Sequence, residues 1–299
     1  MIHSGVEIVE VSPRDGLQNE PEILPTATKL ALINRAIECG FKRIEVASFV
    51  NPRRVPQMAD AEAVVSALPQ NNGVTYIGLA LNERGAERAL PTNVHEIGAV
   101  VCASDGFAMA NQGQTSAQSA DVANNIVAMA KAAGKAAQIT ISTAFGCPFD
   151  GPTSQEWVVE LAAIIASSNP REIALADTIG VATPFEVTKL FEKVKAVVGD
   201  IPLRAHFHNT RNTGIANAYA AYQAGVRIID SSFGGLGGCP FAPNATGNIP
   251  TEDLVYMLSR AGIGTGIDLD KMIETGLWLT GTMGRQLPAM LPRAGKYPI

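Results

Sequence analysis

Two histidines separated by a single residue, His206-Phe207-His208, form the sharpest chemical feature of the sequence. They end the segment LRAHFH, which we predict to be a strand. Because residues i and i+2 of a strand point to one face, both imidazoles project together while Phe207 faces the other way. Paired imidazoles are natural ligands for a divalent metal ion, and the alternative is that both simply hydrogen-bond to polar neighbours. Carboxylates at other strand ends favour the metal.

Charged residues mark the ends of other predicted strands. Arg14 and Asp15 follow the first strand, Glu45 lies within the second and Asp177 ends the sixth. An oxygen of Asp15 would complete a metal site, although a turn or helix-cap role is equally open. Arg14 would stabilise an enolate, bind a carboxylate or pair with Glu45, and these roles are compatible. A carboxylate in a buried strand, as at Glu45, requires a partner.

A glycine-rich segment, GGLGGCPFAPNATGN (234–248), follows the last predicted strand. Glycine-rich loops beside an active site commonly close over substrate. Cys239 in this loop would transfer a proton if its pKa is adjusted, and the alternative is an incidental thiol. The sequence has no C-x-x-C pair, P-loop, G-x-S-x-G or G-x-G-x-x-G motif, so we expect neither a structural zinc site nor those nucleotide or hydrolase sites.

These residues need a scaffold that gathers strand ends. Short, largely apolar runs alternate with longer stretches rich in Ala, Leu and Glu. Most runs are too continuously apolar to have one solvated face, which is typical of parallel strands covered by helices. The eight predicted strands are 6–12, 43–49, 74–80, 96–101, 138–143, 172–177, 203–208 and 227–233. The predicted helices are 26–38, 116–134, 153–168, 185–199, 214–225 and 251–262.

This order predicts an α/β fold, a (β/α)8 TIM barrel, in which catalytic groups lie at the C-terminal ends of the strands. A doubly wound open sheet is the alternative, but it more often has a glycine-rich phosphate turn after its first strand. The corresponding turn here, SPRDGLQNE, has one glycine. We predict a single domain over residues 1–299, with residues from about 263 forming a short C-terminal extension.

Composition excludes several other classes of protein. The chain of 299 residues has a net charge of -5 and no basic cluster, which argues against a nucleic-acid partner. No run approaches about 18 apolar residues, so no membrane span is expected. The first residues match neither a signal peptide nor a transit peptide. Four cysteines form no disulfide framework, so we expect a reducing, cytoplasmic location.

Taken together, five motifs resemble the 3-hydroxy-3-methylglutaryl-CoA lyase family. They are SPRDGLQNE (12–20), IEVASFVNP (44–52), ADTIGVATP (176–184), HFHNT (206–210) and the glycine-rich segment 234–248. The likeness spans nearly the whole chain, in order. The Arg-Asp-Gly and H-x-H motifs alone mark only the wider superfamily of metal-dependent DRE-TIM barrels, which includes isopropylmalate synthase. The G-G-C-P loop is more specific to the lyases.

The resemblance implies roles for the matching positions. The metal ligands, which would hold Mg²⁺ or Mn²⁺, are Asp15, His206, His208 and Asn248. The catalytic residues are Arg14, Glu45, Asp177 and Cys239. Arg14 would steady the enolate of the departing acyl-CoA, Cys239 would serve as acid or base, and Gln18 would contact the substrate together with Arg14. Asp15, a histidine or a metal-bound water would be the general base.

The implied activity is retro-Claisen cleavage of an acyl-CoA thioester, 3-hydroxy-3-methylglutaryl-CoA, to acetyl-CoA and acetoacetate, in a homo-oligomer. The sequence departs from the family at 209–212, where many members read Asp-Thr-Tyr-Gly, and at Pro21, where a lysine is common. Arg211 adds a cation near the mouth. A related substrate, citramalyl-CoA or a longer branched 3-hydroxyglutaryl-CoA, is therefore the main alternative.

Two further readings are less favoured. A condensing enzyme like isopropylmalate synthase usually has a long C-terminal regulatory region. A catalytically silent binding barrel would not be expected to retain the complete set of predicted ligands and catalytic residues.

Overall fold

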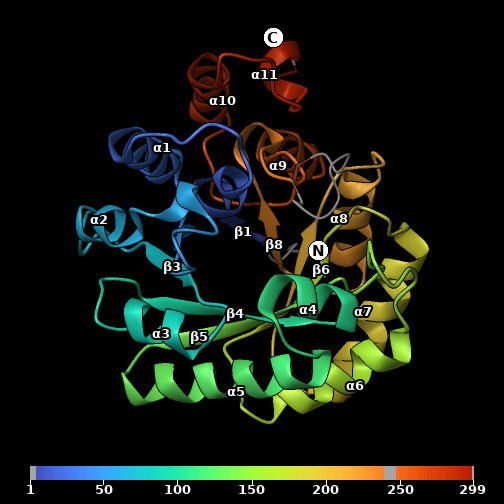
Figure 1. The fold of residues 1–299 in the computed structure, drawn as a ribbon. Helices are drawn as coiled ribbons and strands as arrows, with labels where there is room; N and C mark the ends of the chain where they lie inside the picture. The colour runs from blue at the N-terminus through green and yellow to red at the C-terminus, as the bar shows by residue number, and fades with distance from the viewer. Residues whose placement is uncertain (1–4, 239–246, 298–299) are drawn as a thin grey trace.

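Eight parallel strands close into a barrel in the computed structural model, which describes residues 5–238 and 247–297 (Figure 1). Each strand pairs with the next in sequence, and β8 pairs with β1 to close the sheet. The predicted (β/α)8 barrel is therefore confirmed, and the open-sheet alternative is wrong because a doubly wound sheet leaves two edges unpaired.

All eight strands overlap their predicted ranges, which fits buried parallel strands with continuous apolar character. They are β1 (Glu7–Glu10), β2 (Arg43–Ser48), β3 (Thr75–Leu79), β4 (Glu96–Cys102), β5 (Ala136–Ser142), β6 (Ile173–Asp177), β7 (Leu203–Phe207) and β8 (Ile228–Ser231). The register of β2 against β3 shifts between Glu45 and Ala47, which is a β-bulge beside a predicted site residue.

Helices surround the barrel (Figure 1). They are α1 (Thr26–Cys39), α2 (Ala61–Ser66), α3 (Glu83–Ala89), α4 (Asp105–Gln112), α5 (Ser116–Ala132), α6 (Gln155–Ala166), α7 (Pro184–Val198), α8 (Gly214–Gln223), α9 (Thr251–Arg260), α10 (Leu269–Met283) and α11 (Leu291–Ala294). The sequence did not predict α2, α3 and α4, because 6 to 8 residues are too few for a helical period to emerge.

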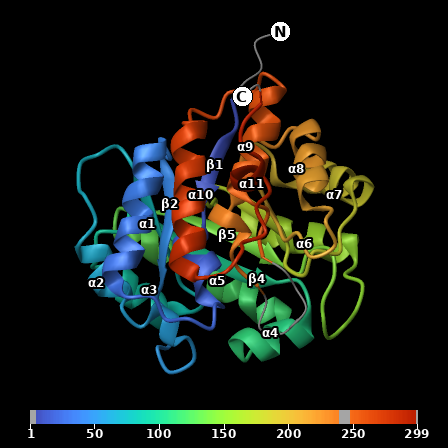
Figure 2. The ribbon, with the colours of Figure 1, turned by 90° about the horizontal axis from the view of Figure 1, so that it is seen from above.

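The segment after residue 263 adds two helices to the outside of the barrel. Helix α10 lies beside α1 and α9, and α11 packs against α9 and α10 (Figure 2). Buried Met272 and Leu279 anchor α10 in the main hydrophobic core, and Arg35 of α1 lies over the Trp278 ring at 4.6 Å. These contacts make the segment a second layer over one side of the barrel. In the described ranges we find no helix with the length and apolar character of a membrane span.

Candidate active site

The turn after β1, η1 (Ser12–Gly16), is π-helical and wraps around one carbonyl oxygen, that of Val11. Three successive amides donate to this oxygen over 3.2, 2.8 and 3.2 Å: those of Arg14, Asp15 and Gly16. A Cβ atom on Gly16 would lie 2.9 Å from the hydroxyl oxygen of Ser232, so close approach explains this glycine. Such π-helical turns occur frequently at functional sites, and this one holds two charged side chains at the barrel mouth.

Three of the predicted metal ligands come together there. Potential ligand atoms of Asp15, His206 and His208 all lie within 4.8 Å of one another. The two imidazoles project from the end of β7 with ring centroids 5.3 Å apart, as the i, i+2 spacing predicts. Both histidines are buried.

The fourth predicted ligand, Asn248, is paired through its backbone with His208. Its Nδ2 donates to Asp15 Oδ2 at 2.7 Å, whereas its buried Oδ1 has no hydrogen-bond partner among the described residues. A buried amide oxygen of this kind calls for a donor or a cation. Two imidazole nitrogens, a carboxylate and an amide oxygen form a donor set that fits a divalent metal ion.

A carboxylate that the sequence analysis did not single out lies behind His206. Asp230 Oδ2 lies 3.0 Å from Nδ1 of this imidazole, while Nε2 faces Asp15 Oδ2 at 3.9 Å. Burial alone would lower the pKa of His206, but Asp230 and Asp15 together outweigh it and raise the pKa. Burial would raise the pKa of Asp230, but Arg204 and His206 hold it below its usual range. A carboxylate on the rear nitrogen of a metal-binding histidine fixes its tautomer and orientation.

Arg14 is held between two carboxylates. Its Nη1 lies 2.5 Å from Asp15 Oδ1 and its Nη2 lies 2.5 Å from Glu45 Oε2, which confirms the pairing with Glu45. Burial would raise the pKa of Asp15, but Arg14 and the imidazoles hold it well below its usual range. Burial outweighs Arg14 at Glu45 and raises that pKa. The Nε of Arg14 is buried and has no hydrogen-bond partner in the described ranges, so this cation retains one donor.

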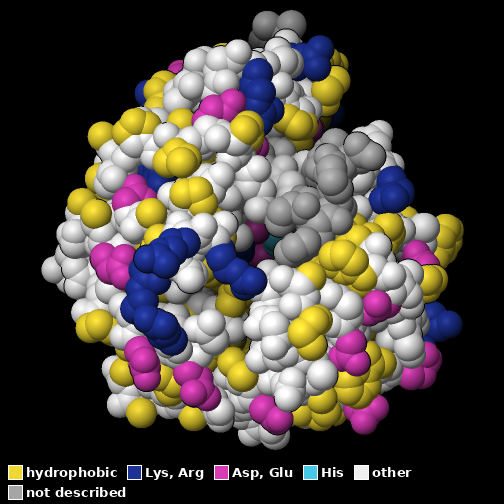
Figure 3. All heavy atoms as spheres, in the orientation of Figure 1, with side chains coloured by type: hydrophobic (Ala, Val, Ile, Leu, Met, Phe, Trp, Pro, Cys, Tyr) yellow, Lys and Arg dark blue, Asp and Glu magenta, His cyan; other side chains and the backbone are white. Residues whose placement is uncertain are grey.

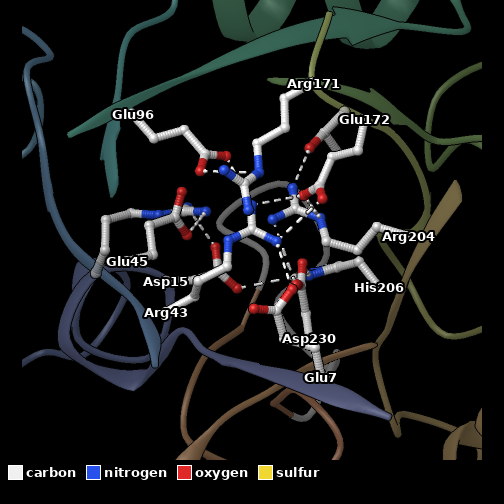
Figure 4. Close-up of polar contacts among 12 residues, drawn as sticks. Glu7, Asp15, Arg43, Glu45, Glu96, Arg171, Glu172, Arg204, His206 and Asp230 are labelled. Carbon is white, nitrogen blue, oxygen red and sulfur yellow. Dashed lines mark hydrogen bonds and ion pairs between the residues drawn. The ribbon is translucent and has the colours of Figure 1, made fainter. Parts of the chain in front are cut away.

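The floor beneath these groups is ionic, whereas branched apolar residues usually fill such barrels. Arg43, only 1% exposed, lies 2.7 Å from Glu96 and 2.9 Å from Glu172. Arg204 then lies 3.4 Å from Glu172 and 3.5 Å from Asp230. Figure 4 shows these side chains converging inside the barrel from different strands. An unbroken series of ion pairs thus connects the barrel floor to the rear of His206.

Other predicted site residues have different surroundings. Asp177 uses its two oxygens to accept the amides of Val181 and Ala182, each at 2.9 Å, so it shapes the turn before α7. Burial raises its pKa despite these hydrogen bonds. Cys239 lies outside the described residues. Arg211 is exposed, and its Nη1 donates to backbone carbonyls of the β6–α7 turn at 3.1 and 2.9 Å.

A groove of about 1180 Å³ opens beside the mouth and is lined in part by Gln18. Its lining also includes four arginines from the segments after β2 and β3: Arg53, Arg54, Arg84 and Arg88. Arg88 pairs with Glu62, whereas the other three are exposed. Figure 3 shows basic side chains gathered beside a central hollow, in which acidic and histidine side chains are visible. The groove therefore offers positive charge next to the candidate site.

Comparison with known proteins agrees with this geometry. A family model described as HMGL-like matches residues 5–277. The chain belongs to the HMGL-like family. The resemblance predicted from the motifs is thereby confirmed, and so is the enzyme class, a lyase like hydroxymethylglutaryl-CoA lyase.

Named relatives of this HMGL-like protein differ in substrate. The chain is 43% identical to (R)-citramalyl-CoA lyase of Chloroflexus aurantiacus, over 98% of this chain and 96% of that protein. It is 37% identical to hydroxymethylglutaryl-CoA lyase YngG of Bacillus subtilis, over 95% of each. Its structure resembles an HMG-CoA lyase of Acinetobacter baumannii in complex with coenzyme A and 3-methylmalate, with a TM-score of 0.94, 41% identity, and coverage of 98% and 96%.

Sequence reasoning on this family member missed the residues behind the ligands, Asp230 and Arg204. A signal was present, because an aspartate within the apolar run RIIDSSF requires a partner as Glu45 does. Arg204 lies two residues before His206 on the same strand and therefore on the same face. What the sequence lacked was the register of β7 against β8, which brings the two charges together.

Proposed function

We propose that the protein is a divalent-metal-dependent lyase that cleaves 3-hydroxy-3-methylglutaryl-CoA to acetyl-CoA and acetoacetate. One observation carries the proposal: a compact set of candidate metal donors, Asp15, His206 and His208, lies beside Arg14, which is partly buried and has an unused donor. Metal chelation and enolate stabilisation are the two needs of a retro-Claisen cleavage.

The metal would be held by Asp15, His206, His208 and Asn248, and Mg²⁺ or Mn²⁺ suits this mixture of oxygen and nitrogen donors. When bound, it supplies Lewis acidity that orients the substrate and makes its 3-hydroxyl easier to deprotonate. The protein's share is to keep the donors in place. Asp230 fixes one imidazole and the backbone pairing with His208 holds Asn248.

Arg14 would stabilise the negative charge that develops as the C2–C3 bond breaks. A base of the site takes the hydroxyl proton, the bond electrons pass to the acetyl-CoA fragment as an enolate, and the other fragment leaves as a ketone. The unused Nε hydrogen of Arg14 gives the enolate oxygen a donor fixed in advance by Asp15 and Glu45. Cys239 would then protonate the enolate carbon, the role that its loop motif indicates.

The groove supports a coenzyme A thioester as the substrate. Coenzyme A carries a diphosphate and a further phosphate, and the exposed Arg53, Arg54 and Arg84 supply cations at a distance from the reacting centre. Guanidinium groups bind phosphate through paired donors. Gln18 lines this groove and follows Asp15 by three residues in the chain, so it would contact the acyl part.

The second candidate is the same reaction on citramalyl-CoA, favoured by the 43% identity to the Chloroflexus enzyme. Cleavage of that thioester gives pyruvate in place of acetoacetate, and acetyl-CoA in both cases. The test offers each thioester with Mg²⁺ and measures acetyl-CoA together with the keto acid, with and without chelator. Metal-dependent release of acetoacetate supports the proposal. Release of pyruvate alone would mean that citramalyl-CoA is the substrate and 3-hydroxy-3-methylglutaryl-CoA is not. Full activity in excess chelator would contradict the metal-dependent mechanism for either substrate.

A further inference from the structure

The backbone of residues 233–238 lies directly against a predicted metal ligand. The carbonyl oxygen of Leu236 accepts a hydrogen from Asn248 Nδ2 at 3.1 Å. A Cβ atom on Gly237 would lie only 2.6 Å from the same nitrogen, and this glycine has a φ of +119°. Only a glycine therefore fits beside the amide at position 237, and the Leu236 carbonyl helps Asp15 to orient the amide.

Two buried carboxylates from outside the barrel lumen hold the start of segment 233–238. Glu252, in the first turn of α9, accepts the amide hydrogen of Gly234 with both oxygens, at 2.9 and 3.0 Å. Glu10, at the end of β1, accepts the amide hydrogen of Phe233 at 3.1 Å. Both carboxyl side chains are completely buried. Residues far apart in the sequence thus accept hydrogen bonds from two consecutive backbone amides.

The partners of these carboxyls are backbone amides and the hydroxyl of Thr251. Burial raises the pKa of Glu10 to about 7 and that of Glu252 to about 8, against the opposing effect of the hydrogen bonds. Burying carboxyls in this way costs stability. What the fold gains in return is a fixed backbone at Phe233 and Gly234.

We infer that Glu252, supported by Glu10, is a positioning residue for the metal site, because it fixes segment 233–238 and thereby orients Asn248. The inference rests on the proposed metal-dependent function. It assigns to the outer layer of the barrel a role in metal affinity. Helix α10 also helps to position the Glu252 carboxyl, because Gly276 packs so closely against it that a Cβ atom there would collide with Oε1.

Two glycines of α10 provide a matched test that replaces no polar side chain. Gly276→Ala must displace the Glu252 carboxyl and also crowds Pro292 Cγ at 2.9 Å, whereas Gly281→Ala places its methyl group in open space. Both changes favour the helix intrinsically by a similar amount. With Mn²⁺ as the probe, calorimetry or spin resonance on the full chain should show about tenfold weaker binding for Gly276→Ala, as for other groups that orient ligands, and wild-type affinity for Gly281→Ala.

A second test removes the hydrogen-bond acceptor itself. Glu252→Ala should weaken Mn²⁺ binding about tenfold, and Glu252→Gln should restore most of the affinity because it retains an oxygen that accepts the Gly234 amide. Asp253→Ala is the control, since that neighbouring carboxylate instead accepts amides near residue 290. In an Asn248→Ala background, Glu252→Ala should cause no further loss, because the two act through one ligand.

The outcomes separate the two proposals. Absence of Mn²⁺ binding in the wild-type protein would overturn the proposed function, and this inference with it. Normal wild-type binding with unchanged affinity in both Gly276→Ala and Glu252→Ala would overturn only the inference. So would an undiminished effect of Glu252→Ala in the Asn248→Ala background. Circular dichroism on each variant shows that the fold is intact, and Gly276→Ala decides if Glu252→Ala does not fold.

Discussion

Asp230→Asn should change the tautomer of His206, a proposed metal ligand, without changing its position. Asp230 lies between two donors, Nδ1 of His206 at 3.0 Å and Nη1 of Arg204 at 3.5 Å. An asparagine side chain has one acceptor oxygen. The permanently charged arginine attracts this oxygen more strongly than the imidazole does. The Asn amide nitrogen then faces Nδ1, which must become an acceptor. The imidazole proton moves to Nε2, the nitrogen that faces Asp15 and would bind the metal.

The size of the effect follows from comparable substitutions. Losing the group behind a metal-binding histidine typically weakens metal affinity about 10- to 100-fold, or roughly 1.4 to 2.7 kcal/mol. We expect this range for Mn²⁺ binding to Asp230→Asn, measured by calorimetry at neutral pH, with a parallel loss of thioester cleavage at limiting metal.

Thr140→Val is the matched control for this substitution. Thr140 accepts a hydrogen from Arg204 Nη2 at 3.1 Å and is not a partner of His206, so its loss disturbs the arginine alone. Metal affinity should therefore stay at the wild-type value. Wild-type Mn²⁺ affinity in a folded Asp230→Asn protein would refute the tautomer reasoning, and an equal loss in Thr140→Val would assign the effect to Arg204.

Three other predictions concern charge. Arg14→Lys keeps the charge but loses the planar fork, so kcat should fall at least about 100-fold with little change in KM, as steady-state kinetics would show. Arg43→Met removes the nearest cation from two buried glutamates, which keep only the longer pairs with Arg171 and Arg204, and should lower the free energy of unfolding in urea by about 3 kcal/mol. Burial raises the pKa of Glu10 from 4.5 to about 7 and of Glu252 from 4.5 to about 8, so the folded state keeps protons that the unfolded chain has released. The contribution of these groups to stability is therefore greatest below about pH 4.5 and is lost as the pH rises to about 8, and Glu252→Gln should flatten that slope in thermal unfolding.

The barrel was predictable because each of its strands can be recognised from its own residues. A run such as EIGAVV (96–101) is apolar or glycine after its first residue, which suits a strand covered on both faces. The convergence of the proposed metal donors His206 and His208 was predictable for a related reason, since the two share a strand face through local geometry alone. Local rules also place Arg14 and Asp15 at one strand end.

The supporting groups were not predictable because they depend on pairs that are distant in sequence. Glu10 belongs to the first strand, yet the amide it holds is that of Phe233. Glu252 looked like an ordinary acid in the first turn of a helix, where the helix dipole favours acids. Only the packing of α9 against the segment after β8 turns it toward Gly234. These roles depend on tertiary contacts, which the periodicity of apolar residues in the sequence does not reveal.

Different residues hold each proposed metal ligand in place, and their location suggests which parts of the fold determine the substrate. His206 is backed by ion pairs inside the barrel, whereas the Asn248 amide is held by a segment fixed from the outer layer. Both supports act from behind the reacting centre, so the chemistry is set by parts of the fold that a substrate does not reach. In the proposed function, the acyl group and coenzyme A would instead contact the loops after the strands, which carry the groove arginines and Arg211. Loops vary more readily than strands. A family with one cleavage mechanism and several thioester substrates is what this division of labour would produce.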